Sequence, residues 1–162
     1  MEQSLITKFF SLLSTRQRNE NHLSDITWAM CESCPEFKHY FLAFFFGENP
    51  EFKRVSMQRE CSRGKSRSDF YFKIGEQEYI IENKIYDRND HFDQYIEDFK
   101  GATFGWIANY TVRNREGVVI RNWESFKQYL ENSIIESNYS IATRDIIESY
   151  VCLLYTSDAA DE

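Results

Sequence analysis

Apolar residues in the first third of the chain recur every three or four positions, which is the period of an amphipathic helix. The spacing predicts three helices, over residues 2–15, from about 19–21 to Pro35, and over 36–46. Gly47 and the Asn49-Pro50 pair are typical of the end of a helix. The chain is therefore expected to begin with helices.

From residue 68 onward the pattern changes to segments rich in aromatic and β-branched residues, which favour strands. Segments 68–74 and 78–86 are separated by Gly75-Glu76-Gln77, which predicts a β-hairpin. The rest of the pattern predicts a helix, two strands and two helices, in the order 90–100, 103–111, 118–121, 123–132 and 141–151. This order of elements predicts a single α/β domain with a mixed sheet.

The predicted hairpin carries charged residues inside an apolar strand. If it closes through a two-residue loop, Gly75-Glu76, Asp69 lies directly opposite Glu82, and two like charges in that relation destabilise a sheet unless something compensates them. A four-residue loop places Asp69 opposite Lys84 instead. Both loops keep the three side chains on one face, whereas a three-residue loop moves Asp69 to the other face.

Two explanations account for these charges, because a buried charge needs a partner or a metal ion. In the first, Asp69 and Glu82 bind a hard divalent cation, and Lys84 contacts the attacking water or the charge that develops on phosphorus. In the second, Lys84 forms a structural ion pair with Asp69 or Glu82. The spacing alone leaves both open.

Composition limits the class of protein. The chain has 162 residues, of which 42% are hydrophobic, enough for a core and too many for a disordered or collagen-like chain. No segment approaches the roughly 18 apolar residues of a membrane span, and none resembles a secretory signal, so we expect no membrane partner and a cytoplasmic location. Four unevenly spaced cysteines do not favour a disulfide scaffold.

Charge is distributed unevenly. The net charge is −7, or −4 without the three acidic residues among the last eleven, which is not typical of a protein that coats nucleic acid. Residues 53–67, however, carry six basic residues and one acidic residue, and such a segment can contact phosphates or face water. The candidate nucleic-acid contacts are Arg59, Arg63, Lys65 and Arg67.

At these residues the chain resembles the PD-(D/E)XK superfamily of nucleases. Ser68-Asp69 followed by the segment 80–84, Ile-Ile-Glu-Asn-Lys, is similar to the D…(D/E)-x-K core, and segments 20–25 and 120–123 are similar to an early acidic motif and a later strand-to-helix junction. The resemblance implies a restriction-endonuclease-like fold, in which helices flank a mixed sheet and N-terminal helices precede the catalytic hairpin.

The resemblance also implies roles for individual residues. Asp69, Glu82 and the backbone carbonyl of Asn83 would bind Mg²⁺ or Mn²⁺, with Glu20 assisting directly or through water. Lys84 would position or activate the water that hydrolyses a phosphodiester bond. The expected substrate is DNA, a role in bacterial or phage defence is plausible, and a homo-oligomer is left open.

The same family branch often has Gln-x-x-x-Tyr in the helix after the motif strand. Here Tyr95 matches the tyrosine and is expected to contribute to catalysis, whereas His91 replaces the glutamine and Gln94 lies one turn away. The alternative function is a catalytically silent module, binding nucleic acid or protein with the same fold. The intact Asp69, Glu82 and Lys84 favour the enzyme.

Residues 152–162 resemble, residue by residue, the translation of an adapter used in sequencing libraries. We therefore expect the native domain to cover residues 1–151, with its C-terminus truncated, and residues 152–162 to be a non-native tail. An ordinary acidic C-terminus is the alternative.

Overall fold

The computed structural model describes residues 20–84, 91–110 and 112–158, with side chains from residue 22 to residue 154 of these ranges. The helix predicted over residues 2–15 lies outside them. The described residues fall into two compact units, residues 20–122 and residues 123–158. The prediction of one domain over residues 1–151 stays a prediction.

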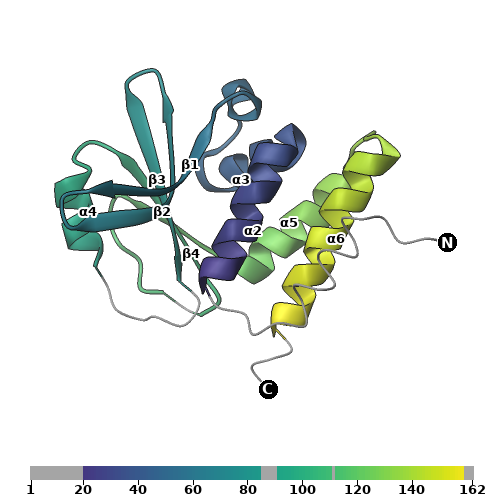
Figure 1. The fold of residues 1–162 in the computed structure, drawn as a ribbon. Helices are drawn as coiled ribbons and strands as arrows, with labels where there is room; N and C mark the ends of the chain where they lie inside the picture. Colours follow the sequence, from purple (N-terminus) through teal and green to yellow (C-terminus); the bar gives the residue numbers. More distant parts are fainter. Residues whose placement is uncertain (1–19, 85–90, 111, 159–162) are drawn as a thin grey trace. The chain divides into compact units, whose positions relative to one another are not determined.

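The first unit is built on a five-stranded mixed sheet (Figure 1). Its strands, adjacent in the order of the chain, are β1 (Met57–Arg63), β2 (Ser66–Ile74), β3 (Gln77–Lys84), β4 (Thr103–Ala108) and β5 (Val118–Asn122). Pairing is antiparallel from β1 to β3 and parallel from β3 to β5. With five α-helices among the described residues of the chain, this confirms the α/β class and the mixed sheet.

Helices cover both faces of this sheet, as Figure 1 shows. On one face lie α2 (Glu20–Ser33) and α3 (Pro35–Phe46), followed by the short 3₁₀ helix η1 (Pro50–Lys53), and on the other lies α4 (Phe92–Asp98). The aromatic residues of α3 belong to the core, as in the edge-to-face contact of Phe41 with Phe70, whose ring centroids are 5.5 Å apart. Gly105 of β4 permits this close packing, because a Cβ there would lie 2.7 Å from the Phe45 ring.

The α4 face has its own apolar cluster. Ile80 packs there with Phe92, Phe99, Phe104 and Trp106. The rings of Phe92 and Trp106 are stacked with centroids 4.4 Å apart. This cluster holds α4 against the sheet and so determines which α4 side chains can reach the ends of β2 and β3.

The β2–β3 hairpin has the two-residue loop considered in the sequence analysis. Ile74 pairs with Gln77, and the register continues to Phe70 opposite Ile81. Gly75 has a φ of 57°, the left-handed conformation that glycine adopts without cost. The register that places Asp69 opposite Glu82 is therefore the one found.

One strand was missed, because the prediction treated residues 53–67 as a basic loop. Residues 57–63 form β1, which pairs with β2 through the turn at Gly64, whose φ is also 57°. A Cβ on Gly64 would lie 2.2 Å from Oδ1 of Asp98, so the turn needs glycine for space as well as conformation. Charged and polar side chains obscured this strand, in which Met57 is the only fully buried residue.

The second unit contains α5 (Trp123–Glu136) and α6 (Ile141–Asp158). Buried residues of α5 recur at helical spacing, and Phe126 contacts Tyr150 of α6 edge to face. Both helices run further than predicted. Apolar spacing continues past Val151 to the buried Leu153 and Leu154, so the helix extends into the segment expected to be a tail. None of the described helices is long and apolar enough to cross a membrane.

Candidate active site

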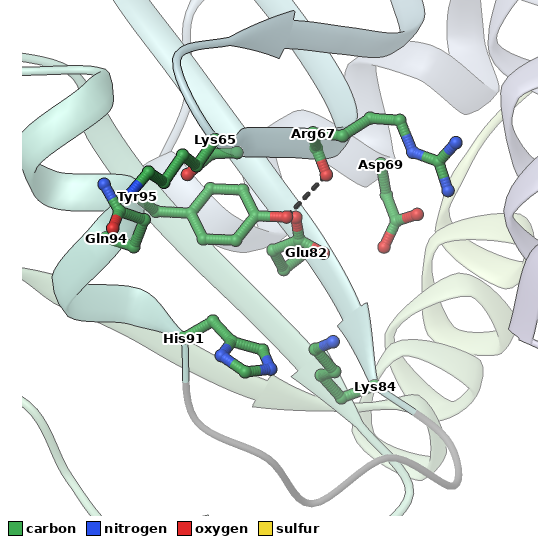
Figure 2. Close-up of a pocket in the computed structure, with 9 residues that line it drawn as sticks. Lys65, Arg67, Asp69, Glu82, Lys84, His91, Gln94 and Tyr95 are labelled. Carbon is green, nitrogen blue, oxygen red and sulfur yellow. Dashed lines mark hydrogen bonds between the residues drawn. The ribbon is translucent and has the colours of Figure 1, made fainter.

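A pocket of about 500 Å³ lies where β2, β3 and the start of α4 meet (Figure 2). Its lining is polar: Lys65, Ser66, Arg67, Asp69, Glu82, Lys84, His91, Gln94 and Tyr95. The set contains Asp69, Glu82, Lys84, Tyr95, Lys65 and Arg67 from the predicted site. Residues up to thirty positions apart in sequence are thus brought to one place.

The strand geometry explains why the three motif residues meet. Phe70 pairs with Ile81, so the next position places Asp69 opposite Glu82 on the α4 face of the sheet. Lys84 follows two residues later on the same face. In Figure 2 the side chains of Asp69, Glu82 and Lys84 all project into the pocket.

Both carboxylate oxygens of Asp69 accept hydrogen bonds. The backbone N–H of Asn83 donates to Oδ2 at 2.8 Å, and Nη1 of Arg59 lies 3.3 Å from Oδ1. The same Nη1 donates to the Asp69 backbone carbonyl at 3.0 Å. Asp69 is therefore held from two sides, and each oxygen keeps a second lone pair that a cation can use.

The surroundings of Glu82 differ from those of Asp69, because its side chain is buried and its carboxylate lacks a full set of hydrogen-bond donors. The residue is 3% exposed, and its Oε1 is buried with no hydrogen-bond partner. Burial raises the pKa of Glu82 well above its ordinary value, and the neighbouring Asp69 carboxyl raises it further. Tyr95 and Lys84 oppose this rise by favouring the charged form.

Tyr95 connects α4 to the two strands. Its hydroxyl donates to the backbone carbonyl of Arg67 (Figure 2). Burial raises the pKa of Tyr95, and the negative charge of Glu82 raises it further. Tyr95 consequently stays protonated and acts as a hydrogen-bond donor beside Glu82.

The four candidate phosphate contacts divide into two pairs. Lys65 and Arg67 line the pocket and are exposed. Arg59 is bonded to Asp25 and Asp69, and Arg63 forms two hydrogen bonds with Glu78, at 2.7 and 2.9 Å. Only Lys65 and Arg67 are thus presented at the pocket, while the other two serve carboxylates of the chain itself.

Asp98 is a site-supporting residue that the sequence analysis missed. Its Oδ2 accepts from the Lys65 backbone N–H at 3.0 Å and from Oγ of Ser66 at 2.7 Å, which ties the β1–β2 turn to α4. These bonds place Lys65 at the edge of the pocket. The signal that could have found the turn was Gly64 within the basic segment, since Gly is typical of a tight turn between two strands.

Of the remaining predicted residues, Asn83 can serve the site only through its backbone. Its side chain points away from the pocket and donates to Oγ of Ser24 at 2.9 Å. His91 and Gln94 line the pocket. Glu20 is the first residue of α2, and its side chain lies outside the described part of the chain.

The donors in the pocket fit a hard cation. Asp69 and Glu82 offer carboxylate oxygens, which Mg²⁺ and Mn²⁺ prefer, and the buried unpaired Oε1 of Glu82 lacks a partner that a cation would supply. Among the described side chains, no group of three His, Cys, Asp or Glu residues could hold a metal ion. The carboxylate pair would therefore need backbone, water or phosphate oxygens to complete a coordination shell.

No protein-family model matches the chain, and searches of curated proteins and of solved structures find no match. The function must therefore be inferred from the site.

Proposed function

We propose that this chain is a metal-dependent nuclease with a restriction-endonuclease-like fold, which hydrolyses phosphodiester bonds in DNA. The order of elements supports the fold, because helices precede a hairpin that carries the acidic residues and a mixed sheet lies between helices. The polar pocket supports the activity, because it joins two carboxylates to a lysine beside exposed basic residues.

The observation that carries the proposal is the Asp69–Glu82 pair. Two carboxyl groups that face each other across a hairpin repel, and the raised pKa of Glu82 reflects that repulsion together with burial. A structural role would give Glu82 a donor for each oxygen, yet Oε1 has no hydrogen-bond partner. A divalent cation bound by both carboxyl groups would offset their repulsion and supply the missing partner of Glu82 Oε1.

Each residue has a defined role in this proposal. Asp69, Glu82 and the Asn83 carbonyl would hold Mg²⁺ or Mn²⁺, and a bound divalent ion makes water more acidic and stabilises charge on phosphate oxygens. Lys84 holds the attacking water or the developing charge on phosphorus. Tyr95 donates a hydrogen bond beside Glu82, and Lys65 and Arg67 bind phosphates of the strand.

Incubation of the full chain with plasmid DNA, with and without Mg²⁺, tests the proposal. We expect Mg²⁺-dependent cleavage that is lost in Asp69→Asn and Lys84→Ala. Lys73→Ala is the matched control, since Lys73 lies on the same hairpin but pairs with Glu76 near the turn, and it should cleave like the wild type. Metal-independent DNA binding without cleavage would instead support the silent interaction module.

A further inference from the structure

Arg59 makes several contacts next to the site. Its side chain is only 10% exposed, and Nε donates to Oδ1 of Asp25 in α2 at 2.9 Å. Nη1 donates to the Asp69 backbone carbonyl and lies 3.3 Å from Asp69 Oδ1. One planar group thus links α2 to the carboxylate that faces the pocket.

The backbone beside Arg59 is also unusual. Glu60 has a φ of 59°, and no other described non-glycine residue has a positive φ. The β1–β2 register omits Glu60, the residue that would lie opposite Asp69. Such a conformation is strained and persists where surrounding contacts enforce it. The irregular strand therefore coincides with the place where Arg59 reaches Asp69.

We propose that Arg59 is a positioning residue that orients the Asp69 carboxylate for cation binding. The inference rests on the proposed function. Because the Asn83 N–H holds Oδ2 and Arg59 contacts Oδ1, the carboxylate cannot rotate freely, and its remaining lone pairs face the pocket. Orientation by a partner outside the coordination shell is a common requirement of metal sites.

This role requires arginine and not merely a positive charge. The guanidinium presents N–H groups in a rigid fork that can bond Asp25 and Asp69 at once, and it lies over the Phe70 ring, 5.7 Å from the centroid. A lysine supplies charge without the fork. The role also replaces the phosphate contact expected from the sequence, because the Arg59 side chain is buried and its nitrogens face the carboxylates of Asp25, Glu60 and Asp69.

Calorimetric titration of the full chain with Mn²⁺ alone, without nucleic acid, measures the effect. We expect Arg59→Met and Arg59→Lys each to weaken Mn²⁺ binding by about 10–100-fold, the usual effect of losing such a partner. Asp25→Ala should weaken it by a smaller factor, because the Asp25 side chain is 61% exposed and anchors only the far side of Arg59.

Arg121→Met is the matched control. Arg121 is also a strand arginine that bonds a helix, through the Phe44 carbonyl, and lies over a phenylalanine ring, but it does not line the pocket. Its Mn²⁺ affinity should equal that of the wild type. Thermal unfolding of each variant, followed by circular dichroism, identifies any variant that fails to fold. If Arg59→Met does not fold, the Mn²⁺ affinity of Asp25→Ala decides in its place.

The outcomes separate the two proposals. Wild-type affinity in Arg59→Lys, or unchanged or tighter binding in Arg59→Met, would mean that Arg59 acts only through its charge or not at all, and would overturn the positioning role. If Arg59→Met does not fold, unchanged Mn²⁺ affinity in a folded Asp25→Ala would overturn the positioning role as well. A wild-type chain that binds no Mn²⁺ would overturn the proposed function itself.

Discussion

Glu78 and Glu82 lie on the same face of β3, four residues apart, yet their surroundings are opposite. Glu78 accepts two hydrogen bonds from Arg63 and one from the Tyr71 hydroxyl, and the Arg63 bonds are the main reason that its pKa is lowered to about 2. Glu82 is buried with an unpaired oxygen and a raised pKa. Side chains of the protein itself thus neutralise and bond Glu78, whereas Glu82 is left without a full set of partners.

This difference separates a structural carboxylate from one prepared for a ligand. The Glu78 carboxylate forms a closed network near the turn of the hairpin, with donors from Arg63 of β1 and Tyr71 of β2. Glu82 faces a pocket, beside a second acid and a lysine. Strand periodicity places both residues alike, so the distinction comes from what packs around them.

The largest expected effect is on catalysis. Glu82→Gln should lower Mg²⁺-dependent cleavage by about 10³-fold, because a bound metal contributes several kcal/mol of charge stabilisation and each 1.4 kcal/mol is a factor of ten. Glu78→Gln should stay within about threefold of the wild type. Initial rates of plasmid cleavage at saturating Mg²⁺ measure both, and equal losses in the two variants would remove the distinction between the glutamates.

The two glutamates should also give opposite dependences of stability on pH. Glu82 has a raised pKa, so the folded state holds its proton longer, and metal-free stability should fall as pH rises above the ordinary glutamate value, by at most about 1.4 kcal/mol per pH unit. Glu78 has a lowered pKa, so its contribution is present above the ordinary value and is lost as pH falls toward 2.

Urea unfolding of the metal-free chain across pH measures these slopes. Glu82→Gln should remove the decline at higher pH, and Glu78→Gln should reduce the loss in acid by about 1 kcal/mol, a modest figure because Arg63 is partly exposed to solvent. An unchanged high-pH slope in Glu82→Gln would show that another group titrates there.

The smallest effects should come from the two tyrosines that accompany the glutamates. Tyr71→Phe removes a donor to Glu78 and should lower the free energy of unfolding by about 0.5–1.5 kcal/mol with cleavage unchanged. Tyr95→Phe removes the hydroxyl that donates to the Arg67 carbonyl beside Glu82 and should reduce cleavage by about tenfold, consistent with one lost hydrogen bond in the site. Loss of activity in Tyr71→Phe but not in Tyr95→Phe would contradict the comparison.

Much of the hairpin could be predicted from the sequence. The glycine at position 75 and the alternation of residues in both segments were enough to identify the two-residue loop as one of the candidates, and that loop places Asp69 opposite Glu82. Strand β1 could not be identified in the same way. Its residues Gln58, Glu60 and Ser62 are polar, and its pairing with β2 depends on a turn fixed by Asp98, more than thirty residues away.

The sequence by itself determined that Glu82 and Lys84 share a face of their strand, because strand alternation is a local property. The structure decided that Asp69 joins them, because it has the two-residue loop that was only one of the candidates from the sequence. Only the tertiary structure decided that Arg59 contacts Asp69, that Tyr95 lies beside Glu82, and that Glu82 is buried with an unpaired oxygen. Burial and counter-charge are set by elements that pack from distant parts of the chain, and no local pattern encodes which of them will meet.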